Sequence, residues 1–130
     1  MPLQRLDHYN IDTTKPDETH QFYTEVLGAG DGSAVRPDFG FPGMWYLIDG
    51  EPLIHVNYID EDKSGPTGCF NHVAFVGSDF AGTCAHLDAH GIDYRAVEHE
   101  HIPLKQIFLK DPNGVRIEIN IRGERRRSDA

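Results

Sequence analysis

The residue most suited to chemistry, by its type and position, is Glu118, a carboxylate in the middle of an alternating β-strand. The strand follows an Asp-Pro-Asn-Gly turn at 111–114, where proline presets φ while asparagine and glycine accept positive φ. One face of the strand is apolar and the other is polar, the apolar residues being Val115, Ile117, Ile119 and Ile121. A carboxylate between β-branched residues is expected to be partly buried, which is unfavourable unless a partner stabilises its charge.

An internal repeat supplies possible partners for Glu118. Asp-His-Tyr-Asn-Ile at 7–11 aligns with Asn-His-Val-Ala-Phe at 71–75, and Ile-His-Val-Asn-Tyr at 54–58 aligns with the strand at 117–121. Because these offsets are nearly equal, the pattern predicts two βαβββ halves related by a pseudo-twofold axis. Equivalent strands then meet, and the polar positions can line one cavity. These positions are His8, His55, His72 and Glu118. Three imidazoles and one carboxylate around a point form a divalent-metal constellation.

The elements that must position these residues follow from periodicity and from turn residues. A helix should begin near Pro16 and end before Gly28, and a second should begin after Ser78-Asp79 and end before Gly91. The expected strands are 6–11, 43–48, 52–59, 70–76, 94–98, 104–110 and 115–121, and the weakly patterned segment 29–41 is expected to hold a short strand and a loop. The prediction is a single α+β domain over 1–130, with module one at about 4–60, module two at about 69–121, and a tail at 122–130.

Composition narrows the classes of partner. The 130 residues carry a formal net charge of −9, so nucleic acids and anionic membranes are unfavourable partners. No apolar run approaches the roughly 18 residues of a membrane span, and the N-terminal segment lacks the apolar core of a secretory signal. Cys69 and Cys84 show no metal or redox spacing and are expected to be buried free thiols. A cytoplasmic location is therefore expected.

These motifs resemble the vicinal oxygen chelate superfamily, which includes glyoxalase I, extradiol ring-cleaving dioxygenases, fosfomycin-resistance proteins and methylmalonyl-CoA epimerase. The resemblance covers residues 6–121. Its most specific pieces are Leu-Asp-His at 6–8, Phe-Tyr-Thr-Glu-Val-Leu-Gly at 22–28, Asn-His-Val-Ala-Phe at 71–75 and Asp-Pro-Asn-Gly-Val-Arg-Ile-Glu at 111–118. The resemblance implies a cup-shaped, partly open sheet with helices on its outer face. It says less about the reaction, because the superfamily supports many chemistries on one fold.

The resemblance also implies roles for individual residues. His8, His72 and Glu118 match the three metal-ligand positions of the metal-dependent members. His55 matches either a fourth ligand, as in glyoxalase I-like members, or a catalytic acid/base, as in ring-cleaving dioxygenases. Phe108 stands where those dioxygenases carry a tyrosine, and it cannot donate a proton. His99 resembles another of their pocket histidines.

Three functions remain open from the sequence. The favoured one is an Fe(II) oxygenase of the extradiol dioxygenase type, with His55 as the acid/base. The second is a glyoxalase- or epimerase-like enzyme holding Ni²⁺, Co²⁺ or Zn²⁺ with all four residues, for which Arg36 and Lys105 are possible contacts to substrate carboxylates; Mn²⁺ is also compatible with the ligands. The third is a resistance protein that sequesters an aromatic compound against Trp45 and Phe108.

The expected partners are a small-molecule substrate and a second copy of the chain. Superfamily members of this size commonly form homodimers, and two βαβββ halves leave sheet edges available for pairing. Neither nucleic acid nor a membrane is expected.

Overall fold

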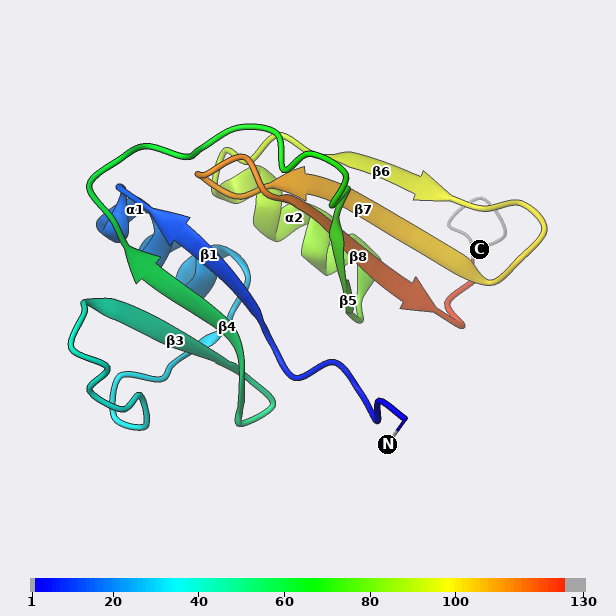
Figure 1. Ribbon diagram of the computed structural model, residues 1–130. Coiled ribbons are helices and arrows are strands. Elements are labelled where there is room, and N and C mark those ends of the chain that lie inside the picture. Colours follow the sequence, from blue (N-terminus) through cyan, green and yellow to red (C-terminus); the bar gives the residue numbers. More distant parts are fainter. Residues whose placement is uncertain (1, 126–130) are drawn as a thin grey trace. The chain divides into compact units, whose positions relative to one another are not determined.

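The structure is a computed structural model that describes residues 2–125 (Figure 1). The chain divides into two compact units, unit 1 (Met1–Ser64) and unit 2 (Gly65–Ala130). Each unit is an open, mixed four-stranded sheet accompanied by one helical segment, so the α+β class and the two βαβββ halves are confirmed.

Unit 1 begins with β1 (Tyr9–Thr13), followed by α1 (Pro16–Gln21) and a π-helical segment, η1 (Phe22–Val26). Then come β2 (Gly30–Asp31), β3 (Gly43–Ile48) and β4 (Glu51–Tyr58), and the sheet has the order β1-β4-β3-β2. The strands β1 and β4 run parallel, while the other pairs are antiparallel. The helical segment packs on the sheet through stacked tyrosines, because the rings of Tyr23 and Tyr46 are both fully buried with centroids 5.4 Å apart.

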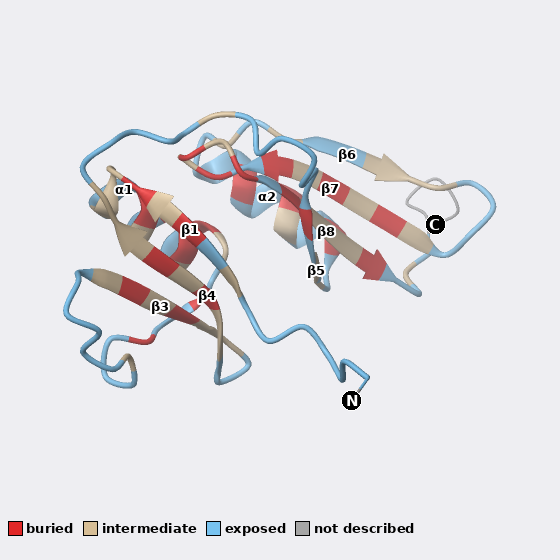
Figure 2. Cartoon of the chain, viewed as in Figure 1, coloured by how far each residue is buried: buried red, intermediate tan, exposed pale blue. Residues whose placement is uncertain are grey.

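Unit 2 repeats this plan with β5 (Val73–Val76), α2 (Phe80–Ala89), β6 (Arg95–Glu98), β7 (Leu104–Lys110) and β8 (Arg116–Arg122). Its sheet has the order β5-β8-β7-β6, again with its first and last strands parallel. Buried and partly exposed residues alternate along β7 (Figure 2), as expected for a strand with one face under a helix, and β8 buries Ile117 and Ile121 on the same side. The core on that face includes Phe80, Leu87, Ile107, Ile117 and Ile121.

The first strand of each unit begins later than its sequence pattern indicates. We expected strands at 6–11 and 70–76, but β1 starts at Tyr9 and β5 at Val73, so His8 and His72 each precede a strand. In unit 1 the register explains the late start. Tyr9 pairs with Ile54, so Asp7 would face Pro52, which has no N–H to offer a ladder. The apolar Leu6 is accordingly 75% exposed rather than part of the core.

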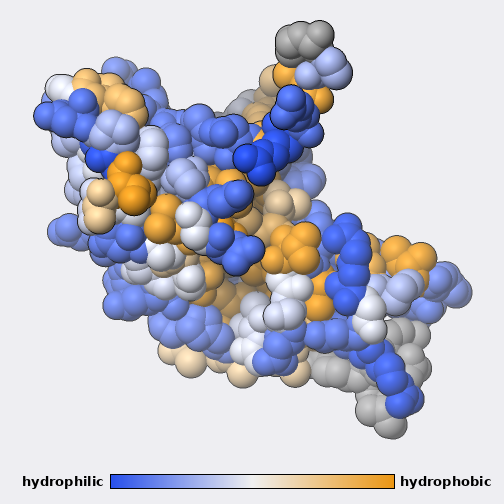
Figure 3. Space-filling view, turned by 90° about the horizontal axis from the view of Figure 1, so that it is seen from below, coloured by the Kyte–Doolittle hydropathy of each residue, from blue (hydrophilic) through white to orange (hydrophobic). Residues whose placement is uncertain are grey.

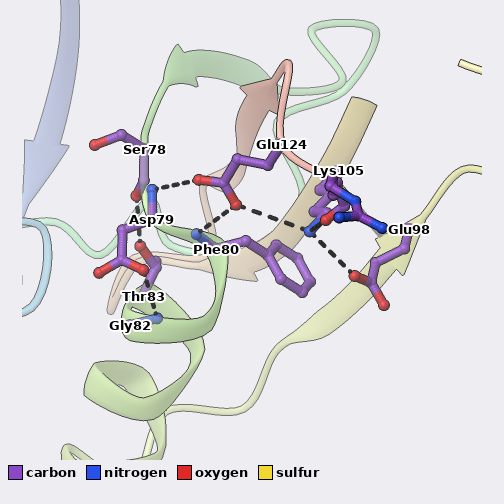
Figure 4. Close-up of polar contacts among 9 residues, drawn as sticks. Ser78, Asp79, Phe80, Gly82, Thr83, Glu98, Lys105 and Glu124 are labelled. Carbon is purple, nitrogen blue, oxygen red and sulfur yellow. Dashed lines mark hydrogen bonds and ion pairs between the residues drawn. The ribbon is translucent and has the colours of Figure 1, made fainter. Parts of the chain in front are cut away.

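The C-terminal part of unit 2 secures the start of α2 (Figure 4). The carboxylate of Glu124 accepts hydrogen bonds from the backbone N–H groups of Asp79 and Phe80, at 2.9 and 3.3 Å. The Asp79 side chain accepts a further bond from the Gly82 N–H, as its predicted capping role requires. Arg122 ends β8, so the first residues of the expected tail contribute to the fold, whereas 126–130 lie outside the described residues.

The two cysteines differ in exposure. Cys84 is buried as expected, but Cys69 is exposed, because it lies in the turn-rich segment ahead of β5 rather than inside a strand. Hydrophilic residues cover most of the face seen in Figure 3, interrupted by smaller hydrophobic groups. Within the described part of the chain, the helices are too short or too polar to cross a membrane.

Candidate metal-binding site

In unit 1, His8 precedes β1, and one of its ring nitrogens is hydrogen-bonded to the preceding residue, Asp7. The Nδ1 atom of His8 lies 2.6 Å from a carboxylate oxygen of Asp7, which can only accept, so Nδ1 carries the proton. The same contact is the leading cause that lowers the pKa of Asp7. The Nε2 atom of His8 therefore carries the lone pair and is the atom through which this ring can bind a metal.

His55, in β4, lies between two aromatic rings. Its ring stacks on His8 at a centroid distance of 3.7 Å and on Trp45 at 4.3 Å. Its Nε2 atom lies 3.0 Å from the carbonyl oxygen of Pro52, so the proton is on Nε2 and the lone pair on Nδ1. Burial, followed by the neighbouring His8, lowers the pKa of His55 below its ordinary value, which favours the neutral ring at neutral pH.

The stacking of His8 and His55 limits how many of the four expected ligands can bind one metal ion. A metal ligated by imidazole lies close to the plane of the ring, about 2.0–2.1 Å from the nitrogen. The two rings are stacked with an interplanar angle of only 12°. One ion cannot lie in both of these nearly parallel planes, so this arrangement allows either ring, but not both, to be a ligand.

In unit 2 the equivalent histidine is held in the same way. The Nδ1 atom of His72 lies 2.8 Å from the side-chain oxygen of Asn71, which leaves the lone pair on Nε2. That Nε2 atom lies 3.6 Å from Oε1 of Glu118, whose side chain is 13% exposed. Glu118 thus lies beside one of the partners that the repeat predicts, an imidazole whose lone pair is on Nε2.

A chain of side-chain hydrogen bonds orients Glu118 from its other oxygen. The amide of Asn120 donates to Oε2 of Glu118 at 2.8 Å, and Gln106 donates to Asn120 at 2.9 Å. The Nε2 atom of His99 lies 2.7 Å from the Gln106 oxygen and is the donor of that pair. Every donor in this chain points toward Glu118, so Oε2 is occupied and Oε1 remains directed at His72.

These residues fit a divalent metal in the chemistry of their donor atoms. Each unit brings together one expected pair, His8 with His55 and His72 with Glu118. Across residues 2–125, no group of three or more His, Cys, Asp or Glu side chains is arranged to hold a metal ion. The residues fit a metal because their hydrogen bonds leave metal-binding atoms available. Two imidazoles donate from Nδ1 to an acceptor, and one carboxylate accepts at only one oxygen. Hydrogen bonds of this kind are typical of metal-binding residues.

A cavity of about 850 Å³ lies beside the unit 2 pair. Its lining includes His72, Glu118 and the expected pocket residue Phe108. This volume is within the roughly 300–1,000 Å³ of small-molecule sites. Of the other expected pocket residues, Trp45 stacks on His55 in unit 1, and His99 supports the hydrogen-bond chain without lining the cavity.

Several functional candidates were missed in the sequence, although signals for them exist. Asn120 lies two residues from Glu118, and Gln106 lies two residues from Phe108, so strand alternation places each on the site face. Arg95 also lines the cavity, with its guanidinium carbon 4.4 Å from the centre of the Phe108 ring. The sequence alone does not place Arg95 near Glu118. The strand register does, because Arg95 pairs with Phe108 and Phe108 pairs with Glu118.

The two cations considered as carboxylate contacts have other partners. Lys105 is buried on the helix-facing side of β7, where its Nζ lies 3.3 Å from Glu98 and 3.8 Å from Glu124 (Figure 4). It is therefore engaged in the fold of unit 2 and absent from the cavity lining. Arg36 donates to the carbonyl oxygen of Phe41 at 3.1 Å and lines a separate cavity in unit 1.

Comparison with known proteins places this geometry in a family. The chain is 33% identical over 125 residues to "Glyoxylase I 4" of Arabidopsis thaliana, covering 90% of this chain and 70% of that protein. It is 32% identical over 73 residues to the manganese-dependent 2,3-dihydroxybiphenyl 1,2-dioxygenase of Geobacillus genomosp. 3, covering 55% of this chain but 22% of that protein. The fosfomycin resistance protein FosX of Listeria monocytogenes shares the fold, with a TM-score of 0.73, 15% identity, and coverage of 94% and 96%.

The model of one family matches residues 5–119, which include all four expected ligand positions. This match covers nearly the whole repeat, and the relatives just described agree with it. The chain therefore belongs to the Glyoxalase/Bleomycin resistance protein/Dioxygenase superfamily.

Proposed function

We propose that this protein is a metal-dependent enzyme that acts on a small molecule carrying two adjacent oxygens, with His8, His72 and Glu118 as the metal ligands. The observation that carries the proposal is that His8 and His72 make the same kind of hydrogen bond. In each, Nδ1 is bound by the side chain of the preceding residue, Asp7 or Asn71, which leaves Nε2 to bind a metal. Two histidines at equivalent positions of the repeat, held in the same tautomer, support a common ligand role.

We favour iron(II) as the metal and an oxygenase reaction of the extradiol dioxygenase type. Two imidazoles and one carboxylate are the ligand set of non-haem Fe(II) oxygenases, although Ni²⁺, Zn²⁺, Mn²⁺ and Co²⁺ are compatible with the same atoms. A divalent metal in this site would supply a positive charge that binds two adjacent substrate oxygens and stabilises the negative charge developing on them. The Asn120 amide binds one oxygen of Glu118 and leaves the other available.

In this proposal His55 handles a proton instead of binding the metal. Its Nε2–H donates to the Pro52 carbonyl, so the Nδ1 lone pair is the atom that would accept a proton from a substrate hydroxyl. Stacking between His8 and Trp45 keeps the ring from rotating freely. The stack also argues against coordination by His8 and His55 together.

The first test is the metal content of gently purified protein, followed by anaerobic reconstitution with Fe(II) and measurement of oxygen uptake with a panel of catechols. Iron in the purified protein and oxygen consumption that is lost on changing Glu118→Gln are the expected results. An absence of oxygen uptake across the panel would contradict the oxygenase reaction. Protein that binds no metal at all would contradict the wider proposal and favour simple sequestration of a ligand.

A glyoxalase-like reaction is the second candidate, and two observations favour it. The similarity to "Glyoxylase I 4" extends over 90% of the chain, and Phe108 has no hydroxyl for the role of the dioxygenase tyrosine. The test is isomerisation of the methylglyoxal–glutathione hemithioacetal by protein loaded with nickel or zinc. Turnover with those metals, together with no oxygen uptake with iron, would establish this candidate over the first.

We also propose that the protein forms a homodimer. In the described sheets, β1 and β2 are the outer strands of unit 1, and β5 and β6 are those of unit 2. Outer strands present backbone groups that a second chain can pair with. Light scattering coupled to size-exclusion chromatography is expected to give the mass of two chains, and the mass of one chain at working concentration would contradict this.

A further inference from the structure

The unit 2 cavity carries more positive charge than the composition of the protein predicts. The chain has 12 Lys and Arg against 21 Asp and Glu, yet the cavity lining includes three cations, Arg95, Lys110 and Arg116, with two carboxylates, Asp93 and Glu118. All three cations are exposed, and no ion pair between them and a carboxylate is found in the described residues. A cationic group in an acidic protein is a local feature that attracts anions.

Strand register places these cations on the same face as Glu118. Arg95 pairs with Phe108 and Phe108 pairs with Glu118, so the three residues form one row across β6, β7 and β8. Lys110 pairs with Arg116, two residues from that row along each strand. Because side chains alternate with a period of two, residues of both rows project from one face of the sheet.

The Arg95–Phe108–Glu118 row has the dimensions and chemistry of a binding site for an aromatic acid. β6 and β8 are two strand spacings apart, about 10 Å, with Phe108 between them. The Arg95 guanidinium lies over the Phe108 ring, so its planar group is held at one end of the row while its N–H groups keep the capacity to bind a carboxylate. The other end is the proposed metal-binding pair, His72 and Glu118.

We propose that the substrate of this site is an aromatic carboxylate that carries two adjacent oxygens, bound with its carboxylate at Arg95 and its ring against Phe108. Lys110 and Arg116 add to the positive potential at the cavity and Arg95 makes the direct contact. This inference rests on the proposed function, because it names the substrate class of the same site. It goes further by assigning specificity to a residue outside the metal ligands.

The test compares two probes of nearly the same shape, the anion 3,4-dihydroxybenzoate and the neutral 3,4-dihydroxybenzamide, in which an amide NH₂ replaces one carboxylate oxygen. Their binding is measured by isothermal titration calorimetry with the protein as purified and again after removal of metal by a chelator. We expect the acid to bind about tenfold more tightly than the amide, because a charge-assisted hydrogen bond contributes more than a neutral one. Raising the salt concentration should weaken binding of the acid and leave the amide unaffected.

Variants assign the preference to one residue. Arg95→Met keeps a long side chain over Phe108 but removes the charge, and it should lose most of the preference for the acid, with Lys110 and Arg116 accounting for the small remainder. Arg95→Lys should retain part of the preference, and Arg122→Met should retain all of it, because Arg122 is an exposed arginine of β8 outside the cavity lining. Circular dichroism spectra that match the unmodified protein would confirm that the variants fold.

Two results would overturn the inference: no tighter binding of the acid than of the amide, including no detectable binding of either, or an equal loss of preference in Arg95→Met and Arg122→Met. The proposed function is judged separately by metal analysis. Metal binding without a preference for the acid contradicts the substrate class and leaves the metal site standing. A preference for the acid in a protein that binds no metal supports the role of Arg95 and contradicts the metal-dependent function.

Discussion

The two units place the same asparagine at equivalent positions and use it differently. In unit 1, Asn57 of β4 pairs in register with Asp12 of β1 and donates to its carboxylate at 3.2 Å. In unit 2, the equivalent Asn120 pairs with Val76, whose side chain cannot accept a hydrogen bond. Asn120 therefore bonds to Gln106 and Glu118.

This difference shows how one backbone plan supports two kinds of site residue. His55 in unit 1 is held by ring stacking and one carbonyl, whereas Glu118 in unit 2 is held by a directed chain of amides. A neutral ring is suited to stacking, while a carboxylate needs donors to remain charged when partly buried. The partner on the neighbouring strand, Asp12 or Val76, decides whether the asparagine is available for that task.

The largest expected effect comes from removing the carboxylate of unit 2 and comparing the result with removal of its symmetry mate. Glu118→Gln should weaken metal binding by more than roughly 100-fold, since changes in supporting residues alone typically weaken it about 10–100-fold. His55→Ala should leave metal affinity little changed while lowering turnover. Competition with a chromophoric chelator measures both affinities. A large loss of affinity in His55→Ala would mean that the stacked arrangement of His8 and His55 opens when a metal binds.

The next largest effect is expected from removing the hydrogen bond that Asn120 donates to Glu118. Asn120→Ala should weaken metal binding about 10–100-fold, because Glu118 loses the donor that orients it. Asn57→Ala is the matched control in unit 1, where the bond goes to Asp12, and it should not change metal affinity. The same chelator competition applies. Equal losses in the two variants would show that Asn120 acts through the general stability of the fold.

Helix anchoring gives a smaller difference, measured as the free energy of unfolding. Glu124→Gln should destabilise the protein by about 1 kcal/mol, because the carboxylate accepts two backbone N–H groups at the start of α2. Asp17→Asn, in the first turn of α1, should cost only about 0.3 kcal/mol, because no side-chain capping bond is made there. Urea unfolding monitored by circular dichroism tests both. Equal costs would mean that Glu124 acts only as a charge near the helix.

The smallest effect is on the pH dependence of stability in metal-free protein. Since the pKa of His55 is lowered on folding, the native state binds fewer protons, and its stability should fall as the pH drops below about 6.5 and level off below the native pKa. Trp45→Ala exposes the ring and should raise this pKa, whereas Phe108→Ala, the equivalent change in unit 2, should not. Titration of the imidazole signals by NMR measures the shift. An unchanged His55 pKa in Trp45→Ala would contradict burial by the stack.

The fold could be predicted from the sequence because its signals are local and repeated. Alternation in the strands, the glycines that end both helical segments, and the near-equal offsets between the halves led to two βαβββ units, which the structure confirms. The early starts expected for β1 and β5 were wrong, since alternation at residues 6–8 and 70–72 cannot report whether a partner strand is present. The exposure of Cys69 was missed for the same reason.

The residue types at His8, His55, His72 and Glu118 are determined by the sequence alone, and so is the equivalence of their positions in the two halves, because both follow from identity and spacing. Only the tertiary structure decided which ring nitrogen each histidine keeps free, that His55 stacks on His8, and that Asn120 and Arg95 face the site. These features depend on strand register and on hydrogen-bond partners distant in the chain. Periodicity places a side chain on a face, but it does not reveal what lies opposite.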